Sequence, residues 1–164
     1  MDFLKIFGGK KSKFKLIGRV RVVHKDKDGN TLSDTGWLYN TITNAGKAEA
    51  ANLLGNVSTP TAFTYLALGT SNTAESASHT ALQAEITDTG LARAAATVSR
   101  VTTNQTNDTL QLAKTWTATG AKTVEEIGVF NAASAGTMLG RKLTTSKALA
   151  NGETLAATYQ IIVS

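Results

Sequence analysis

Few residues of this 164-residue chain could carry acid–base or metal chemistry, and their spacing does not bring them together. The two histidines, His24 and His79, lie in unrelated contexts, and neither has the i,i+4 partner that a zinc-binding helix provides. Glu125 and Glu126 are adjacent, so on a strand their carboxylates point to opposite faces. We expect one of them to face solvent and the other to receive a cation or a backbone amide.

The motifs of nucleophilic and phosphate chemistry are missing from the sequence. It contains no GxSxG nucleophile elbow and no GxxxxGK[ST] phosphate-binding loop. Serine and threonine are abundant, but a hydroxyl without a positioned base is not a nucleophile. The chain has no cysteine, which excludes disulfides and thiolate metal sites. The sequence therefore predicts a protein that is not an enzyme, with no catalytic residues, no cofactor and no metal.

The net charge of +5 is concentrated at one end of the chain. Residues 1–27 carry nine cations and two anions, a balance of +7, whereas residues 28–164 carry eight cations and ten anions, a balance of −2. A basic end favours an acidic partner: a protein surface, a nucleic acid or an anionic lipid. The sequence has no apolar run of about 18 residues and no apolar region typical of a secretory signal, so we expect no membrane partner.

The basic end is predicted to be an arm, residues 1–14, that precedes a single β-rich domain, residues 15–164. It holds more large apolar side chains than a disordered tail usually does. The candidate partner-binding residues are Phe3, Leu4, Ile6, Phe7, Lys10, Lys11 and Lys13. Aromatic residues among lysines are also typical of single-strand nucleic-acid binders, but the body has no basic stripe beyond Arg19 and Arg21. A protein surface is therefore the favoured partner.

Periodicity predicts a mainly β fold, an antiparallel β-sandwich or a jelly-roll-like barrel with one or two short helices. About eight strands at short spacing, separated by turn residues such as Asp28-Gly29 and Asn151-Gly152, are typical of this architecture. One helix is expected with Asn44 as its N-cap and its end at Gly55, and a second helical turn near Thr80. The expected strands are residues 15–25, 36–42, 63–68, 91–101, 109–119, 124–130, 138–143 and 153–164.

Residues 63–86 form the most distinctive stretch of the chain. A buried strand at residues 63–68 is followed by Gly69-Thr70 and by a loop of small residues. Leu82 and Ile86 are the large apolar residues near the end of this stretch, and we expect them to fix the loop against the sheet. The stretch has no catalytic partner elsewhere in the chain, so it is interpreted as a structural corner.

Three large aromatic residues bear on the choice between a structural and a sugar-binding role. Trp37, Tyr39 and Trp116 all lie on predicted strands. Because large aromatics contribute much of the apolar area of a core, we expect them to be buried. If they were exposed instead, they would suit a β-sandwich that binds host glycans.

Three segments together resemble a known family. YLALGTSNTAESASHTALQAEI is similar to an "ALGTG…T.A…TAL..E" pattern, VEEIGVFNAASAGTMLGRKL to "EIGLFNA…GTLLAR", and NTITNAGKAEAANLL to "N.ITN.G…A.LL". These patterns occur in this order in small structural proteins of tailed bacteriophages, and the resemblance covers roughly residues 40–143. Glu126 and Gly128 keep the pattern, Phe130 is expected to pack inside, and Ser71 stands where the family often has a second glycine.

This resemblance implies a component of the virion, located on the capsid surface or the tail and assembled in the host cytoplasm. The leading hypothesis is a capsid decoration (cement) protein, a homotrimer whose basic arm docks on the major capsid protein and stabilises the shell. The first alternative is a tail, baseplate or fibre-base protein that contacts other virion proteins. The second alternative is a host-glycan-binding β-sandwich.

Overall fold

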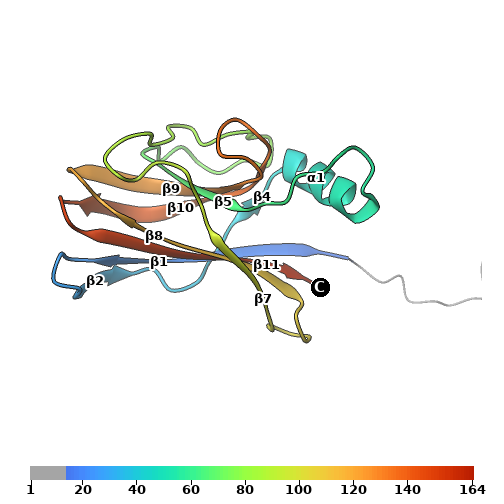
Figure 1. Ribbon diagram of the computed structural model, residues 1–164, viewed down its shortest axis with the longest axis horizontal. Coiled ribbons are helices and arrows are strands. Elements are labelled where there is room, and N and C mark those ends of the chain that lie inside the picture. Colours follow the sequence, from blue (N-terminus) through green and yellow to red (C-terminus); the bar gives the residue numbers. More distant parts are fainter. Residues whose placement is uncertain (1–13) are drawn as a thin grey trace, which may run out of the picture.

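Two antiparallel sheets pack face to face in the computed structural model, which describes residues 14–164 (Figure 1). The first sheet has the order β2-β1-β11-β8-β7, and β3 also pairs with β1; the second has the order β4-β10-β9-β5-β6. The first sheet consists of β1 (Leu16–Lys25), β2 (Thr31–Asp34), β3 (Leu38–Tyr39), β7 (Thr97–Val101), β8 (Thr109–Thr117) and β11 (Thr154–Val163). The second consists of β4 (Thr41–Ile42), β5 (Tyr65–Gly69), β6 (Ala94–Ala95), β9 (Lys122–Phe130) and β10 (Met138–Leu149). The predicted β-sandwich class is confirmed.

The core between the sheets follows the alternation of the sequence. Val20 on β1 lies opposite Tyr159 on β11, which in turn lies opposite Leu112 on β8, and all three are fully buried. Trp116 is buried as predicted, and its Nε1 donates a hydrogen bond of 2.9 Å to the carbonyl oxygen of Ala92. Residues two apart on each strand thus face the same layer, as the pleat of a strand requires.

The chain crosses between the sheets at two places where the sequence predicted continuous strands. The predicted strand 36–42 is divided into β3, which pairs with β1, and β4, which pairs with β10. The predicted strand 91–101 is likewise divided into β6, which pairs with β5, and β7, which pairs with β8. These two predictions were wrong because β propensity indicates only that a segment is extended. It does not indicate which sheet the extended segment joins.

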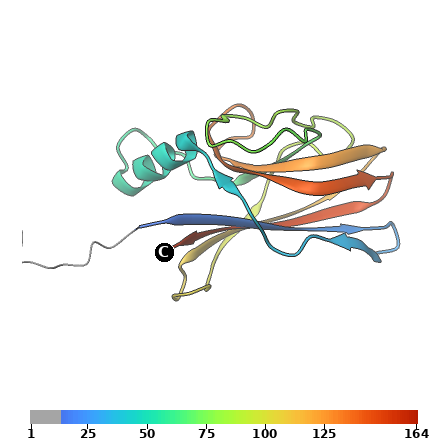
Figure 2. The same cartoon turned by 180° about the vertical axis from the view of Figure 1, so that it is seen from behind.

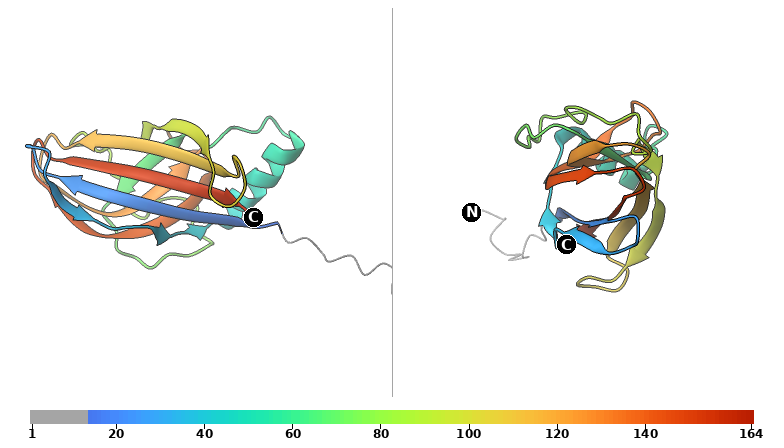
Figure 3. Two further views of the ribbon diagram at one scale, coloured as in Figure 1. Left: turned by 90° about the horizontal axis from the view of Figure 1, so that it is seen from below. Right: turned by 90° about the vertical axis from the view of Figure 1, so that its left-hand side faces the viewer.

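Each crossing links an edge strand of one sheet to an edge strand of the other, so the two long sides of the sandwich are both closed by the chain (Figure 3). Edge strands that continue into the neighbouring layer leave less backbone free for pairing with another protein. The ends of the sandwich therefore become the places where its interior can be reached from outside.

One helix, α1 (Asn44–Gly55), lies at the end of the sandwich where β1 begins and β11 ends (Figures 1 and 2). Its N-cap is Thr43, whose Oγ1 accepts a hydrogen bond of 2.9 Å from the backbone N–H of Gly46. Asn56 ends the helix in the left-handed conformation, with φ at 48°. The helix was predicted; the second helical turn near Thr80 was not found, and that segment is a loop.

Glu126 on β9 and Arg141 on β10 form an ion pair that is completely buried, with Nε of Arg141 2.5 Å from Oε2 of Glu126. The Glu126 carboxylate also accepts backbone N–H hydrogen bonds from Gln83 at 3.2 Å and Ala84 at 2.8 Å. Arg141 donates to the carbonyl oxygen of Thr73 at 2.9 Å. The two charges therefore satisfy each other and hold the loop of residues 70–86 against the second sheet, as expected for one member of the Glu125–Glu126 pair.

The loop of residues 70–86 is a structural corner, as predicted. Leu82 and Ile86 are buried, and the N–H of Ile86 donates to the carbonyl oxygen of Leu68 at 2.8 Å. A Cβ atom at Gly69 would lie 2.4 Å from Oε1 of Glu126, so the carboxylate can reach the loop only because this position has no side chain.

We predict that Glu126→Gln lowers the free energy of unfolding by about 3–5 kcal/mol, since the guanidinium of Arg141 would remain buried without a counter-charge. Urea denaturation measures this difference. Glu125→Gln is the matched control, because Glu125 is the neighbouring residue on β9 and is only partly buried. A loss for Glu126→Gln no larger than that for the control would contradict the assigned role of the ion pair.

Candidate functional site

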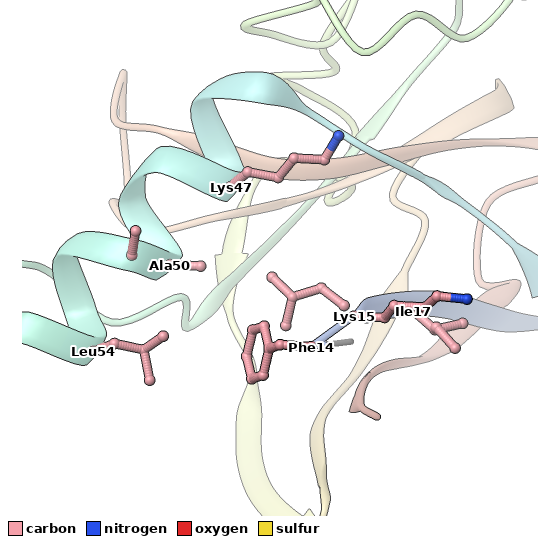
Figure 4. Close-up of a pocket in the computed structure, with 8 residues that line it drawn as sticks. Phe14, Lys15, Ile17, Lys47, Ala50 and Leu54 are labelled. Carbon is pink, nitrogen blue, oxygen red and sulfur yellow. The ribbon is translucent and has the colours of Figure 1, made fainter. Parts of the chain in front are cut away.

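An apolar groove lies at the end of the sandwich beside α1 (Figure 4). Its outer part has a volume of about 470 Å³ and is formed by one face of α1 and by the first residues of β1 with Phe14 before them. In Figure 4 the side chains of Ala50 and Leu54 point from α1 toward the ring of Phe14. The residues of the outer part are Phe14, Lys15, Leu16, Ile17, Lys47, Ala50, Ala51 and Leu54.

The inner part of the groove reaches the hydrophobic core through the open end of the sandwich. Leu110 and Ile161 contribute from the first sheet, and Leu139 contributes from the second. Leu16 and Leu110 pack against the core but are only partly buried. A helix that covered this end completely would bury them, so α1 leaves the core partly open here.

The position of α1 explains why the groove is open. Gly46 is the only buried residue of the helix, and a Cβ atom there would lie 2.4 Å from the carbonyl oxygen of Leu139. The helix therefore contacts β10 through its backbone near its first turn. Its bulky residues near the other end remain exposed: Leu54 is 75% exposed, and Phe14 across the groove is 61% exposed. An exposed apolar surface of this kind is typical of sites that bind another protein, a membrane or a ligand.

The charged side chains around the groove are both cationic. Lys15 and Lys47 line it, and no acidic residue is among the described residues that form its walls. The groove thus offers apolar area with two ammonium groups at its rim. This combination suits a segment that carries large apolar side chains together with a carboxylate.

The seven predicted partner-binding residues, Phe3, Leu4, Ile6, Phe7, Lys10, Lys11 and Lys13, lie outside the described residues. The chain enters the described part at Phe14, which is itself a wall of the groove. Sequence reasoning did not find the groove. The available signal was the composition of the helix at residues 44–55, whose only bulky apolar residues are Leu53 and Leu54 near its end.

A second candidate surface is an aromatic edge formed by Trp37 and Tyr39 beside β1. Tyr39 is 66% exposed and Trp37 is 39% exposed, so the prediction that they are core residues was wrong. Trp37 directly precedes β3 and Tyr39 is the last residue of β3, a short strand at the edge of its sheet that has no further strand to cover it. The guanidinium carbon of Arg19 lies 4.4 Å from the centroid of the Trp37 ring. The Nε of Arg19 donates a hydrogen bond of 2.8 Å to Oε1 of Gln160.

The same side of β1 carries a second arginine. Arg21 donates from Nε to the two carboxylate oxygens of Asp34 at 2.9 and 3.1 Å. The hydrogen bond from Arg21 is the main reason that the pKa of Asp34 falls to about 2. Arg21 is therefore neutralised by a neighbour, whereas Arg19 is held by an aromatic ring and a neutral amide.

The two histidines lie in separate surroundings in the described part of the chain. No group of three or more His, Cys, Asp or Glu side chains that could hold a metal is found in residues 14–164. His24 is buried, and its Nε2 lies 2.8 Å from Oε2 of Glu153. His79 lies beside Arg141, with 3.4 Å between its Nδ1 and Nη1 of the arginine. Within residues 14–164, no helix has the length and hydropathy needed to span a membrane.

Residues 40–163 match the family described as podophage GP4 fiber I protein gp80. The chain belongs to this family. The matched region contains α1, the whole second sheet and strands β7, β8 and β11 of the first, but it begins after Phe14, β1, β2 and β3. No curated protein and no solved structure matches the chain. The predicted resemblance to structural proteins of tailed bacteriophages is confirmed, and the chain is a phage virion structural protein.

We predict that Gly46→Ala destabilises the protein by about 1–3 kcal/mol, because the added methyl group would force α1 away from the backbone of Leu139. Gly55→Ala in the same helix is the matched control, since its Cβ would contact only the side chain of Val57. We expect the control to be neutral or slightly stabilising. Thermal or urea unfolding of the two variants compares them directly, and equal losses would argue against close packing of α1 on β10.

Proposed function

We propose that the chain is a structural subunit of a phage fibre, joined to neighbouring virion proteins at the end of the sandwich where α1 and the N-terminal residues lie. The observation that carries this proposal is the apolar groove, which leaves Leu54 exposed together with Phe14, the residue that directly follows the basic N-terminal segment in the sequence. The fibre protein for which the family is named supports placing the joint in a fibre rather than in the capsid shell.

The contact that residues 1–13 make with a neighbouring protein is called the joint here. It would be stabilised by the burial of apolar side chains and by the presence of several such contacts in one assembly. Burying one large apolar side chain contributes about 1.5–3 kcal/mol, so a segment with four such residues can hold a subunit even after its ordering entropy is subtracted. Several copies of the joint in one assembly strengthen each other by effective concentration. The lysines at positions 10, 11 and 13 would meet acidic residues of the neighbouring protein.

A capsid decoration protein is the other structural assignment. There the same N-terminal segment would dock on the major capsid protein, and the subunit would occur in hundreds of copies. A fibre subunit would occur in a handful or dozens. Quantitative mass spectrometry of purified particles, scaled to the major capsid protein, separates the two assignments. A stoichiometry of hundreds per particle would contradict the fibre assignment.

We predict that particles assembled with a chain lacking residues 1–13 lose most of this subunit, because both the apolar and the basic parts of the joint are removed. Quantitative immunoblotting of purified particles measures its occupancy. The matched control is the triple variant Lys10→Ser, Lys11→Ser and Lys13→Ser, which keeps the apolar residues and should retain part of the occupancy. Full occupancy without residues 1–13 would exclude the N-terminal segment as the joint.

A glycan-binding role is a second candidate, favoured by the exposure of Trp37 and Tyr39. Sugars stack their apolar faces on aromatic rings and accept hydrogen bonds from arginine, and Arg19 lies opposite Tyr39 in the register of β1 and β3. This edge is separate from the groove, so one subunit could use both surfaces.

We predict that, if the aromatic edge binds glycans, Tyr39→Ala weakens binding on a host-glycan array at least tenfold while leaving the fold intact. Trp116→Phe is the control, since Trp116 is buried and should affect stability instead of binding. Absence of binding by the unmodified protein, or equal binding by Tyr39→Ala, would remove this candidate.

A further inference from the structure

We propose that the apolar groove of one subunit receives residues 1–7 of a second copy of the same chain. This inference rests on the proposed structural function and names the partner for the groove. It begins from the exposure of Phe14 and Leu54 and from the access that the groove gives to Leu110, Leu139 and Ile161 of the core. A surface of this kind in a virion protein calls for an occupant with large apolar side chains.

Residues 1–7 have the composition that the groove requires. Within them Phe3, Leu4, Ile6 and Phe7 supply large apolar side chains. Asp2 is the only acidic residue among the first 25, and it lies next to these residues in the sequence. Residues 1–7 also carry Lys5, which offsets Asp2, so the match to the groove rests on the apolar side chains, and Asp2 is the one group that can pair with Lys15 or Lys47 at the rim.

The length of the connection permits the contact. Residues 8–13 separate Phe7 from Phe14, and six residues span at most about 20 Å when extended. Gly8-Gly9 allows the chain to change direction directly after the apolar residues. A connection of this length can bridge two neighbouring subunits whose groove-bearing ends face each other.

The charge of the connection favours a second copy over the subunit's own groove. To enter its own groove, the chain would have to reverse within residues 8–13, because Phe14 already forms the wall of that groove. The reversal would crowd Lys10, Lys11 and Lys13 against Lys15 and Lys47 with no acidic residue in the described groove wall to offset them. An extended connection to a neighbour avoids this reversal and leaves the three lysines accessible to other virion proteins.

The contact between residues 1–7 of one subunit and the groove of another would determine the symmetry of the oligomer. The donated segment and the receiving groove are different surfaces, so two subunits can exchange segments with each other, or each subunit can give to one neighbour and receive from another. Head-to-tail contacts of this kind produce a closed ring when the rotation between subunits closes. The homotrimer expected from the sequence is one such ring.

Oligomeric state tests the proposal in the purified full-length protein. By light scattering after size exclusion, we expect the full chain to be an oligomer and the chain lacking residues 1–7 to be a monomer. Leu54→Ser should raise the dissociation constant at least tenfold, whereas Leu32→Ser should not, because Leu32 is an exposed leucine on β2 outside the groove. A monomeric full chain, or an oligomer that survives deletion of residues 1–7, would overturn the proposal.

Cross-linking distinguishes exchange from self-occupation. The chain has no cysteine, so single cysteines can be introduced without interference. We expect a mixture of the variants Ile6→Cys and Leu54→Cys to form disulfide-linked pairs of chains under mild oxidation. A disulfide formed only within single chains of the double variant would show that the segment occupies its own groove, which contradicts exchange. If the particle experiment shows that residues 1–13 are required while the purified chain stays monomeric, the proposed function stands and the exchange does not.

Discussion

The buried pair of Glu126 and Arg141 is the interaction on which the second sheet and its loops depend. Removing two charges from water is costly, and the cost is offset here because the carboxylate accepts two backbone N–H groups while the guanidinium also donates to a loop carbonyl. The pair thus connects β9, β10 and residues 70–86 in one network. An apolar pair of similar volume could fill the same space, but it could not hold a loop whose small side chains offer little to pack.

The scarcity of large apolar side chains also affects the rest of the molecule. With few aromatic residues available, the core is a thin layer between two sheets, and the two crossings of the chain close its long sides. The end beside α1 is covered less completely, because the helix contacts β10 through Gly46 and keeps Leu54 on its surface. Under the proposed function, this open end is where a neighbouring chain would supply the missing apolar cover.

The distribution of charge separates the roles of the two ends of the sequence. The body is close to neutral and keeps its ion pairs, such as Arg21 with Asp34 and Arg141 with Glu126, within itself. The positive excess lies in residues 1–27, which precede the region that the fibre family matches. The region that the family matches thus contains most of the β body, and the positive excess lies outside it.

The sequence by itself determined the β class, the position of the helix, the structural corner at residues 63–86 and the special role of one glutamate at 125–126, because each is encoded by local alternation, turn residues or adjacency. Burial of Trp116 was predictable for the same reason. Only the tertiary structure decided that Trp37 and Tyr39 are exposed, that two predicted strands divide between the sheets, and that Phe14 and Leu54 face each other across a groove. These features depend on which distant strands pair and on where the helix meets β10, and a local pattern of side chains contains no information about partners that lie far away in the chain.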